Sequence, residues 1–110
     1  MKRILGAMFC TGLSLLPLTQ ARAWDGEPAG TISQLDVVVI DGEQYGFRVH
    51  LDGSPVVCNG MTWGYVNKSA GNYEAAVSIL NSAFLSGKPV TLFVTMTNSY
   101  CRIDYIIMRK

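Results

Sequence analysis

The chain has little of what most enzymes and nucleic-acid-binding proteins depend on. Its 110 residues include one histidine, His50, and only nine basic and eight acidic residues. It contains no serine-hydrolase, zinc-protease, dithiol or phosphate-binding glycine motif. A zinc site would need carboxylate partners for His50, and none stands at a recognisable spacing. We therefore expect a protein that is not an enzyme and that uses no metal or other cofactor.

His50 itself lies in an alternating stretch and points away from the apolar side of that stretch. No acidic residue accompanies it at a fixed spacing. We therefore interpret it as an exposed strand histidine rather than as a general base.

A long hydrophobic run is also missing. The longest apolar stretch, Ile4 to Leu18, is roughly 15 residues, short of the ~20 that a membrane-spanning helix needs. Lys2 and Arg3 precede it, and Ala21-Arg22-Ala23 offers small residues where a signal peptidase reads. We predict a signal peptide over residues 1–23, cleaved before Trp24, and a secreted or periplasmic product. A membrane anchor is the alternative.

Cleavage changes the charge of the chain. It removes Lys2, Arg3 and Arg22 and leaves 87 residues, 24–110, with six basic and eight acidic side chains. The net charge is then −2 with His50 neutral, so no basic surface indicates nucleic acid as a partner. This length suits a single domain with one modest core.

Cysteine is scarce but even in number after cleavage. Cys10 leaves with the signal peptide, and Cys58 and Cys101 remain. In an exported chain such a pair indicates a disulfide, here closing a loop of roughly 44 residues. Two buried free thiols, or a metal pair lacking its other ligands, are the alternatives.

The hydrophobic pattern predicts mostly strands. Thr31 to Ile40 is β-rich, Asp41-Gly42 is a turn signal, and Tyr45 to Leu51 alternates strictly, so these stretches form a hairpin. Val56 to Cys58 and Thr62 to Val66, split by Asn59-Gly60, are interpreted as one bulged strand or as two short ones. Leu92 to Met96 and Cys101 to Ile107 alternate again, with Cys101, Ile103, Tyr105 and Ile107 expected on one face.

One helix interrupts the strands. Asn72 is the expected N-cap, and Tyr73, Val77, Leu80 and Phe84 form an apolar stripe. Gly87 ends the helix. Strand, strand, strand, helix, strand, strand is the element order of an OB-fold, a β-barrel of five antiparallel strands with its helix between strands 3 and 4. An open antiparallel sheet crossed by one helix is the competing architecture.

Aromatic residues provide the candidate ligand-binding positions. Trp63 and Tyr65 share one face of a strand, with Asn67 and Lys68 nearby to bond hydroxyl groups. Tyr100 and Arg102, beside Cys101, form a second polar and aromatic position. Aromatic planes suit the C–H faces of sugar rings, so these residues favour a carbohydrate ligand. The alternative is that Trp63 and Tyr65 fill the interior of the barrel.

Four stretches carry a family resemblance: Trp24 to Glu27, Ile40 to Tyr45, Trp63 before the helix, and Ser86 to Thr91. Together they resemble the B subunits of subtilase-cytotoxin and pertussis-like AB5 toxins. The resemblance implies a secreted, disulfide-bonded OB-fold that forms homo-pentameric rings with a separate A-type subunit and binds cell-surface glycans. Ile106 and Met108 are then expected at the contacts between copies.

The chain also departs from that family. Pro28-Ala29 falls where the family's pocket has a serine, so its sialic-acid contact does not carry over. The chain ends at Lys110, without the family's long C-terminal segment and second cysteine pair. A monomeric periplasmic or secreted interaction module, such as an inhibitor or accessory protein, is the alternative function.

Overall fold

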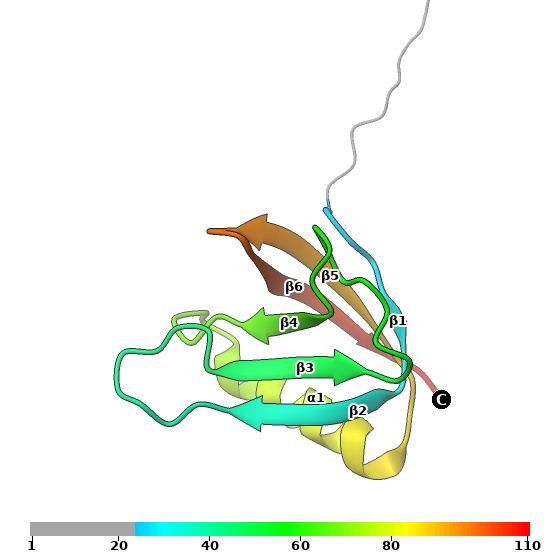
Figure 1. The fold of residues 1–110 in the computed structure, drawn as a ribbon. Coiled ribbons are helices and arrows are strands. Elements are labelled where there is room, and N and C mark those ends of the chain that lie inside the picture. The colour runs from blue at the N-terminus through cyan, green and yellow to red at the C-terminus, as the bar shows by residue number, and fades with distance from the viewer. Residues whose placement is uncertain (1–23) are drawn as a thin grey trace, which may run out of the picture.

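The computed structural model describes residues 24–110, and the predicted signal peptide over residues 1–23 lies outside them. The fold is mostly β: one helix packs on a sheet of six strands (Figure 1). In chain order the elements are β1 (Ala29–Gly30), β2 (Ile32–Val37), β3 (Phe47–Leu51), β4 (Trp63–Val66), α1 (Tyr73–Ser86), β5 (Val90–Thr97) and β6 (Tyr100–Met108).

The strand count and the pairing differ from the prediction of five antiparallel strands. Six strands lie in the order β1-β5-β6-β4-β3-β2, and the pair β4–β6 is parallel. The sixth strand is β1, which lies just before the predicted first strand over residues 31–40 and is separated from β2 by Thr31 alone. β1 pairs with β5 and β2 pairs with β3, so the two edges of the sheet are consecutive in the chain.

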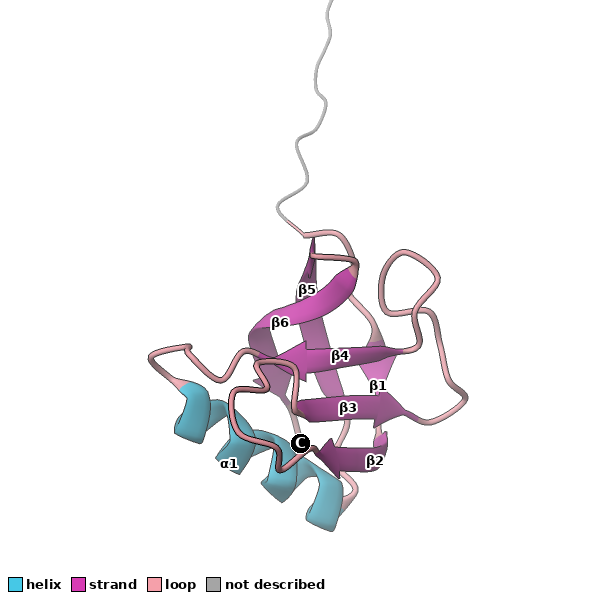
Figure 2. Ribbon diagram, turned by 60° about the vertical axis from the view of Figure 1, so that its left-hand side comes forward, coloured by secondary structure: helices cyan, strands magenta, loops and turns pink. Residues whose placement is uncertain are grey.

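Alternation places aliphatic side chains on the inner face of the sheet, where α1 lies (Figure 2). Phe47, Val49 and Leu51 of β3 are buried, while Arg48 and His50 between them are only half-buried. Leu80 and Ala83 are the buried residues of α1, and Leu92 and Val94 of β5 complete the centre of the core. The core is therefore almost entirely aliphatic.

The helix forms where it was predicted, and its buried face follows the expected stripe except at Phe84. Asn72 precedes it without a side-chain capping bond, and Gly87 ends it in the left-handed conformation with φ 70°. Phe84, expected in the stripe, is exposed, and Ala83 is buried in its place. The small side chain of Ala83 lets the helix approach the sheet closely.

A bulge in β6 corrects the predicted faces of the last strand. Phe93 pairs with Tyr105 and Val94 pairs with Ile103, so Asp104 is an extra residue in β6. Cys101 and Ile103 are buried as expected, but the extra residue reverses the alternation and turns Tyr105 outward. Ile106, which pairs with the buried Leu92, packs against the core instead.

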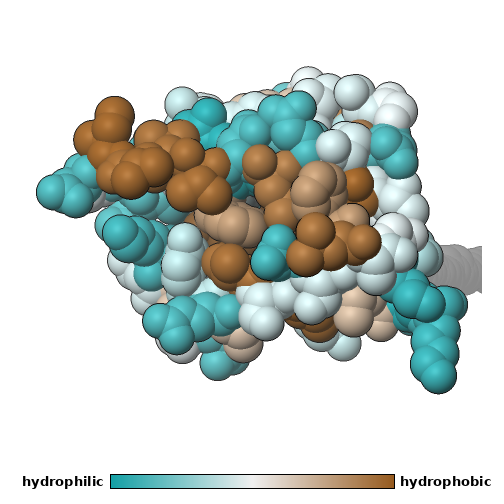
Figure 3. Space-filling model, turned by 90° about the horizontal axis from the view of Figure 1, so that it is seen from below, coloured by the Kyte–Doolittle hydropathy of each residue, from teal (hydrophilic) through white to brown (hydrophobic). Residues whose placement is uncertain are grey.

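Exposed apolar side chains gather at the helix and at the end of β2. Val37, Val39 and Ile40 are exposed where β2 enters the loop to β3, and Phe84 and Leu85 are exposed on α1. Figure 3 shows brown side chains in both areas when the molecule is seen from below. Both areas lie outside the core.

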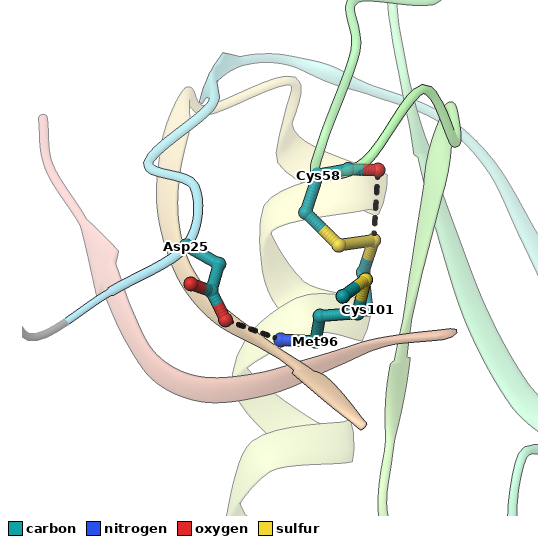
Figure 4. The surroundings of a disulfide bond; sticks show 4 residues. All are labelled: Asp25, Cys58, Met96 and Cys101. Carbon is teal, nitrogen blue, oxygen red and sulfur yellow. Dashed lines mark hydrogen bonds between the residues drawn. A yellow bond between two sulfur atoms is a disulfide. The ribbon is translucent and has the colours of Figure 1, made fainter. Parts of the chain in front are cut away.

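The predicted disulfide between Cys58 and Cys101 is present (Figure 4). It ties the segment before β4 to β6, and both cysteines are buried. The start of the described chain is held nearby. Asp25 accepts a hydrogen bond from the backbone N–H of Met96 at 2.8 Å, and Gly26 and Val94 exchange two backbone hydrogen bonds.

Candidate functional site

The candidate residues meet on the outer face of the sheet, the face turned away from α1. Arg48 of β3 pairs with Tyr65 of β4, and Tyr65 also pairs with Arg102 of β6. His50 pairs with Trp63. Because paired residues on neighbouring strands point to the same side, these side chains share one surface.

Four aromatic rings form a cluster on this surface: Tyr45, Trp63, Tyr65 and Tyr100, called the aromatic cluster below. Tyr45 contacts Tyr65 edge to face with ring centroids 4.7 Å apart, and lies 4.8 Å from Tyr100. Trp63 lies 5.4 Å from Tyr100. These separations are those of favourable aromatic pairs, so the rings hold one another in place.

Within the cluster the rings differ in access to solvent. Tyr65 is only 2% exposed and lies at the base, whereas Trp63, Tyr45 and Tyr100 are half-buried around it. Burial raises the pKa of the Tyr65 hydroxyl, and the neighbouring Tyr45 adds to that increase. Trp63 and Tyr100 thus present part of their ring surface to solvent, while Tyr65 is buried against Tyr45.

Arg48 covers part of Trp63. Its guanidinium carbon lies 4.6 Å from the ring centroid, a cation–π contact. The side chain is fixed by a hydrogen bond from its Nε to the Tyr45 carbonyl oxygen at 2.9 Å and by an ion pair with Glu43 at 3.8 Å. Arg48 therefore orients Trp63 and the Tyr45 loop together.

Arg102 forms an ion pair with Asp104, the extra residue of the bulge in β6. Its Nε donates to Asp104 Oδ1 at 2.7 Å, and a second guanidinium nitrogen lies 3.3 Å from Asp104 Oδ2. Hydrogen bonding to Asp104 raises the pKa of Arg102 further above its usual range. Thr95 also donates to Asp104, at 2.6 Å. The carboxylate is therefore held by two neighbours.

The structure brings Trp63, Tyr65, Tyr100 and Arg102 together, which joins the two positions that the sequence presented separately. Asn67 and Lys68 lie in the loop after β4 instead. The Asn67 side chain accepts a bond from the Ser69 N–H at 2.9 Å, and the Lys68 N–H donates to Gln44 at 3.4 Å. Across residues 24–110, neither side chain bonds to the aromatic cluster.

Sequence reasoning missed Tyr45, Arg48 and the partner of His50. His50 Nε2 lies 2.8 Å from Asp36 Oδ2, so the expectation of a histidine without an acidic partner is wrong. The signal was available in the hairpin: with Gln34 opposite His50, a diagonal neighbour on β2 is Asp36. Hydrogen bonds from Gln34 and His50 lower the pKa of Asp36 below its usual value.

The contact between His50 and Asp36 leads to a prediction about the stability of the fold at acid pH. Because the pKa of Asp36 is lower in the folded protein, the unfolded chain binds the proton more readily. The stabilisation is therefore present above pH ~4 and is lost as the pH falls through the lowered value. In urea unfolding at pH 5 and pH 3, we expect Asp36→Asn to lose less stability on acidification than the wild type.

Asp41→Asn, in the exposed β2–β3 loop, is the matched control and should retain the wild-type acid response. Equal acid responses of Asp36→Asn and the wild type would contradict the assignment.

An apolar hollow lies between α1 and β6, and Asp104 and Tyr105 are among the residues that line it. It has a volume of about 290 Å³ and is lined by Ala75, Ile79, Ile103 and Ile106 among others. Over residues 24–110, no three His, Cys, Asp or Glu side chains gather as a metal site. The helix in that part of the chain is not long and apolar enough to cross a membrane.

Comparison with known proteins yields no relative: no family model, no curated protein and no solved structure matches the chain.

Proposed function

We propose that the chain is a secreted, non-catalytic binding protein of the OB-fold type that recognises glycans through the aromatic cluster. The observation that carries this proposal is that the rings of Trp63 and Tyr100 are half-buried on the outer face, in one cluster with the buried Tyr65. Aromatic side chains normally fill interiors, yet in residues 24–110 the buried core cluster includes one aromatic ring, that of Phe47, among aliphatic side chains. Rings held at the surface offer flat apolar area to the C–H face of a sugar.

The pairing of the strands supports the OB-fold part of the proposal. Only Thr31 separates β1 from β2, and these strands form opposite edges of the sheet. A chain that joins both edges in this way favours a sheet curled toward a barrel. The helix follows β4, the third of the long strands, as the OB-fold element order requires.

Groups around the aromatic cluster suit hydroxyl recognition. The Asn98 amide donates to the Tyr45 hydroxyl at 3.3 Å, and the carboxylates of Asp104 and Asp36 lie at the borders. Each charged group near the rings has an oppositely charged or hydrogen-bonded partner, as in Arg48–Glu43 and Arg102–Asp104. Such a surface is polar without a strong field of one sign, which favours sugars over nucleic acid.

Export is the second part of the proposal. The predicted signal peptide and the Cys58–Cys101 disulfide both favour an oxidising compartment, either the periplasm or the exterior. By resemblance to toxin B subunits, we further propose a ring of five copies that accompanies an A-type subunit. Exposed Val39, Ile40 and Met108 provide apolar area for contacts between copies.

A monomeric interaction module is the second candidate function. The apolar hollow between α1 and β6 favours it, because a partner's side chains fit such a site better than sugars do. The two candidates predict different ligands and different masses.

Glycan binding tests the first candidate. We expect purified protein to bind members of a glycan array, and Trp63→Ala to weaken that binding about tenfold or more, since a lost stacking contact is of that order. Phe84→Ala, an exposed aromatic on α1, is the matched control and should bind as the wild type does. Native mass spectrometry of the same sample should give the mass of five copies.

An array without bound glycans, or equal binding by Trp63→Ala and the wild type, would contradict the glycan proposal. A monomer at micromolar concentration would exclude the ring and leave the glycan site to be judged by the array alone.

A further inference from the structure

A second group of aromatic rings lies on the outer face of the sheet. Trp24 lies 5.6 Å from Phe93 and 6.4 Å from Tyr105, and Phe93 stacks on Tyr105 at 5.0 Å. The three rings come from the start of the described chain, from β5 and from β6. We call them the second platform. Tyr105 is 52% exposed, so the platform is open to solvent.

The platform faces outward because of the bulge at Asp104. Leu92 and Val94, the neighbours of Phe93 in β5, are fully buried, so Phe93 points to the opposite side. The extra residue in β6 turns Tyr105 to that same side. Without the bulge, the alternation from Ile103 would direct Tyr105 into the core and Ile106 outward. The backbone irregularity thus exposes an aromatic ring and buries an aliphatic side chain.

The second platform and the aromatic cluster lie along one strand. Tyr100 belongs to the aromatic cluster and Tyr105 to the platform, five residues apart in β6. At roughly 3.3 Å per residue, the separation is about 16 Å, more than one sugar ring spans. Arg102, Asp104 and Thr95 lie between them and bond to one another. The path between the rings is polar and carries compensating charges.

We infer that the ligand is an oligosaccharide of neutral sugars that contacts both aromatic groups, with hydroxyl groups bonding along Arg102, Asp104 and Thr95. The inference rests on the proposed glycan function and extends it from one sugar to a chain of several. Two stacking surfaces with a hydrogen-bonding stretch between them match the alternating apolar faces and hydroxyl edges of such a chain. Neutral sugars fit because Arg48, His50 and Arg102 each already contact a carboxylate.

The two tryptophans in residues 24–110 allow each aromatic group to be monitored separately, since Trp24 belongs to the platform and Trp63 to the aromatic cluster. In Trp63→Phe the remaining fluorescence reports the platform, and in Trp24→Phe it reports the cluster. The probes are members of one homologous series of neutral glycans, from one to six sugars, chosen from those that bind on the array.

We expect short members to change only the Trp63 emission and long members to change both. Affinity should rise about tenfold between the short and the long members. Tyr105→Ala should remove that rise while leaving the affinity for short members unchanged. Leu85→Ala, an exposed side chain on α1, is the control and should change neither.

Affinity that is independent of chain length, or a Trp24 emission that never responds, would overturn the inference while leaving the glycan function standing. An array with no bound glycan would overturn both. Loss of an oligomer in Tyr105→Ala, measured by native mass spectrometry without a change in sugar affinity, would show that the platform binds a second copy instead.

Discussion

Replacing Cys58 and Cys101 together with alanine should lower the free energy of unfolding by about 4 kcal/mol. The bridge joins residues 43 apart in sequence, so its loss frees a long loop in the unfolded chain. A domain of this size has a total stability of roughly 5–15 kcal/mol, and such a loss removes a large part of it. We expect the melting temperature to fall by about 20 °C.

Reduction of the wild type provides the matched control, because two thiols keep nearly the volume of the disulfide in the core. If the constraint on the unfolded chain dominates, the reduced wild type and the double alanine variant lose similar amounts of stability. Both cysteines are buried, so alanine also leaves small cavities. A reduced protein that unfolds at the same urea concentration as the oxidised protein would contradict the prediction.

The features that could be predicted from the sequence are those that depend on the local pattern of apolar and polar residues. Phe47, Val49 and Leu51 alternate with polar residues, and the strand they form is buried on the same alternation. The helix was equally legible, because Gly87 supplies the left-handed residue that ends it. The disulfide followed from the cysteine pair that remains after the predicted cleavage in an exported chain. These features depend on local pattern or on composition.

Features that depend on distant pairing could not be predicted. The parallel contact between Tyr65 and Arg102 joins segments separated by the whole helix. The bulge at Asp104 is a mismatch between two strands, so the pattern of β6 alone gives no sign of it. Because of that one extra residue, Tyr105 faces outward instead of inward, and the predicted faces of the last strand are wrong beyond Ile103.

The candidate site shows the same division. Trp63 and Tyr65 were identified from their spacing, and Tyr100 with Arg102 from their place beside Cys101. The two pairs come together only because β4 lies beside β6. Tyr45 was expected in a strand, yet it precedes β3 and reaches the cluster from the loop. A loop residue belongs to no periodic pattern that would show where its ring lies. The contribution of Tyr45 to the cluster therefore could not be predicted from the sequence.

The largest effect of a single substitution is expected at Gly26. A Cβ atom there would lie 1.9 Å from the Val57 carbonyl oxygen and 3.1 Å from a methyl group of Val94. The obstacle at Val57 is backbone, so no side-chain rotation relieves it. Either the segment beginning at Trp24 leaves β5, or the backbone next to the Cys58 disulfide moves.

Both responses are costly. Moving the segment breaks the two backbone bonds with Val94 and the Asp25 bond to Met96, and it removes Trp24 from the second platform. Moving Val57 disturbs a side chain that is almost fully buried. We expect Gly26→Ala to lower the free energy of unfolding by about 3 kcal/mol, at the upper end for overpacking, as measured by urea unfolding.

Gly71→Ala is the matched control, because a Cβ atom at Gly71 meets no atom within 4 Å. Its stability should stay within about 0.5 kcal/mol of the wild type. The Trp24 emission of Gly26→Ala in a Trp63→Phe background distinguishes the two responses. A shift toward that of exposed tryptophan means that the segment has left β5, whereas an unchanged spectrum with the same loss of stability places the strain at Val57. If Gly26→Ala is as stable as Gly71→Ala, the prediction is wrong and the close contact between Gly26 and the Val57 carbonyl group does not constrain the fold.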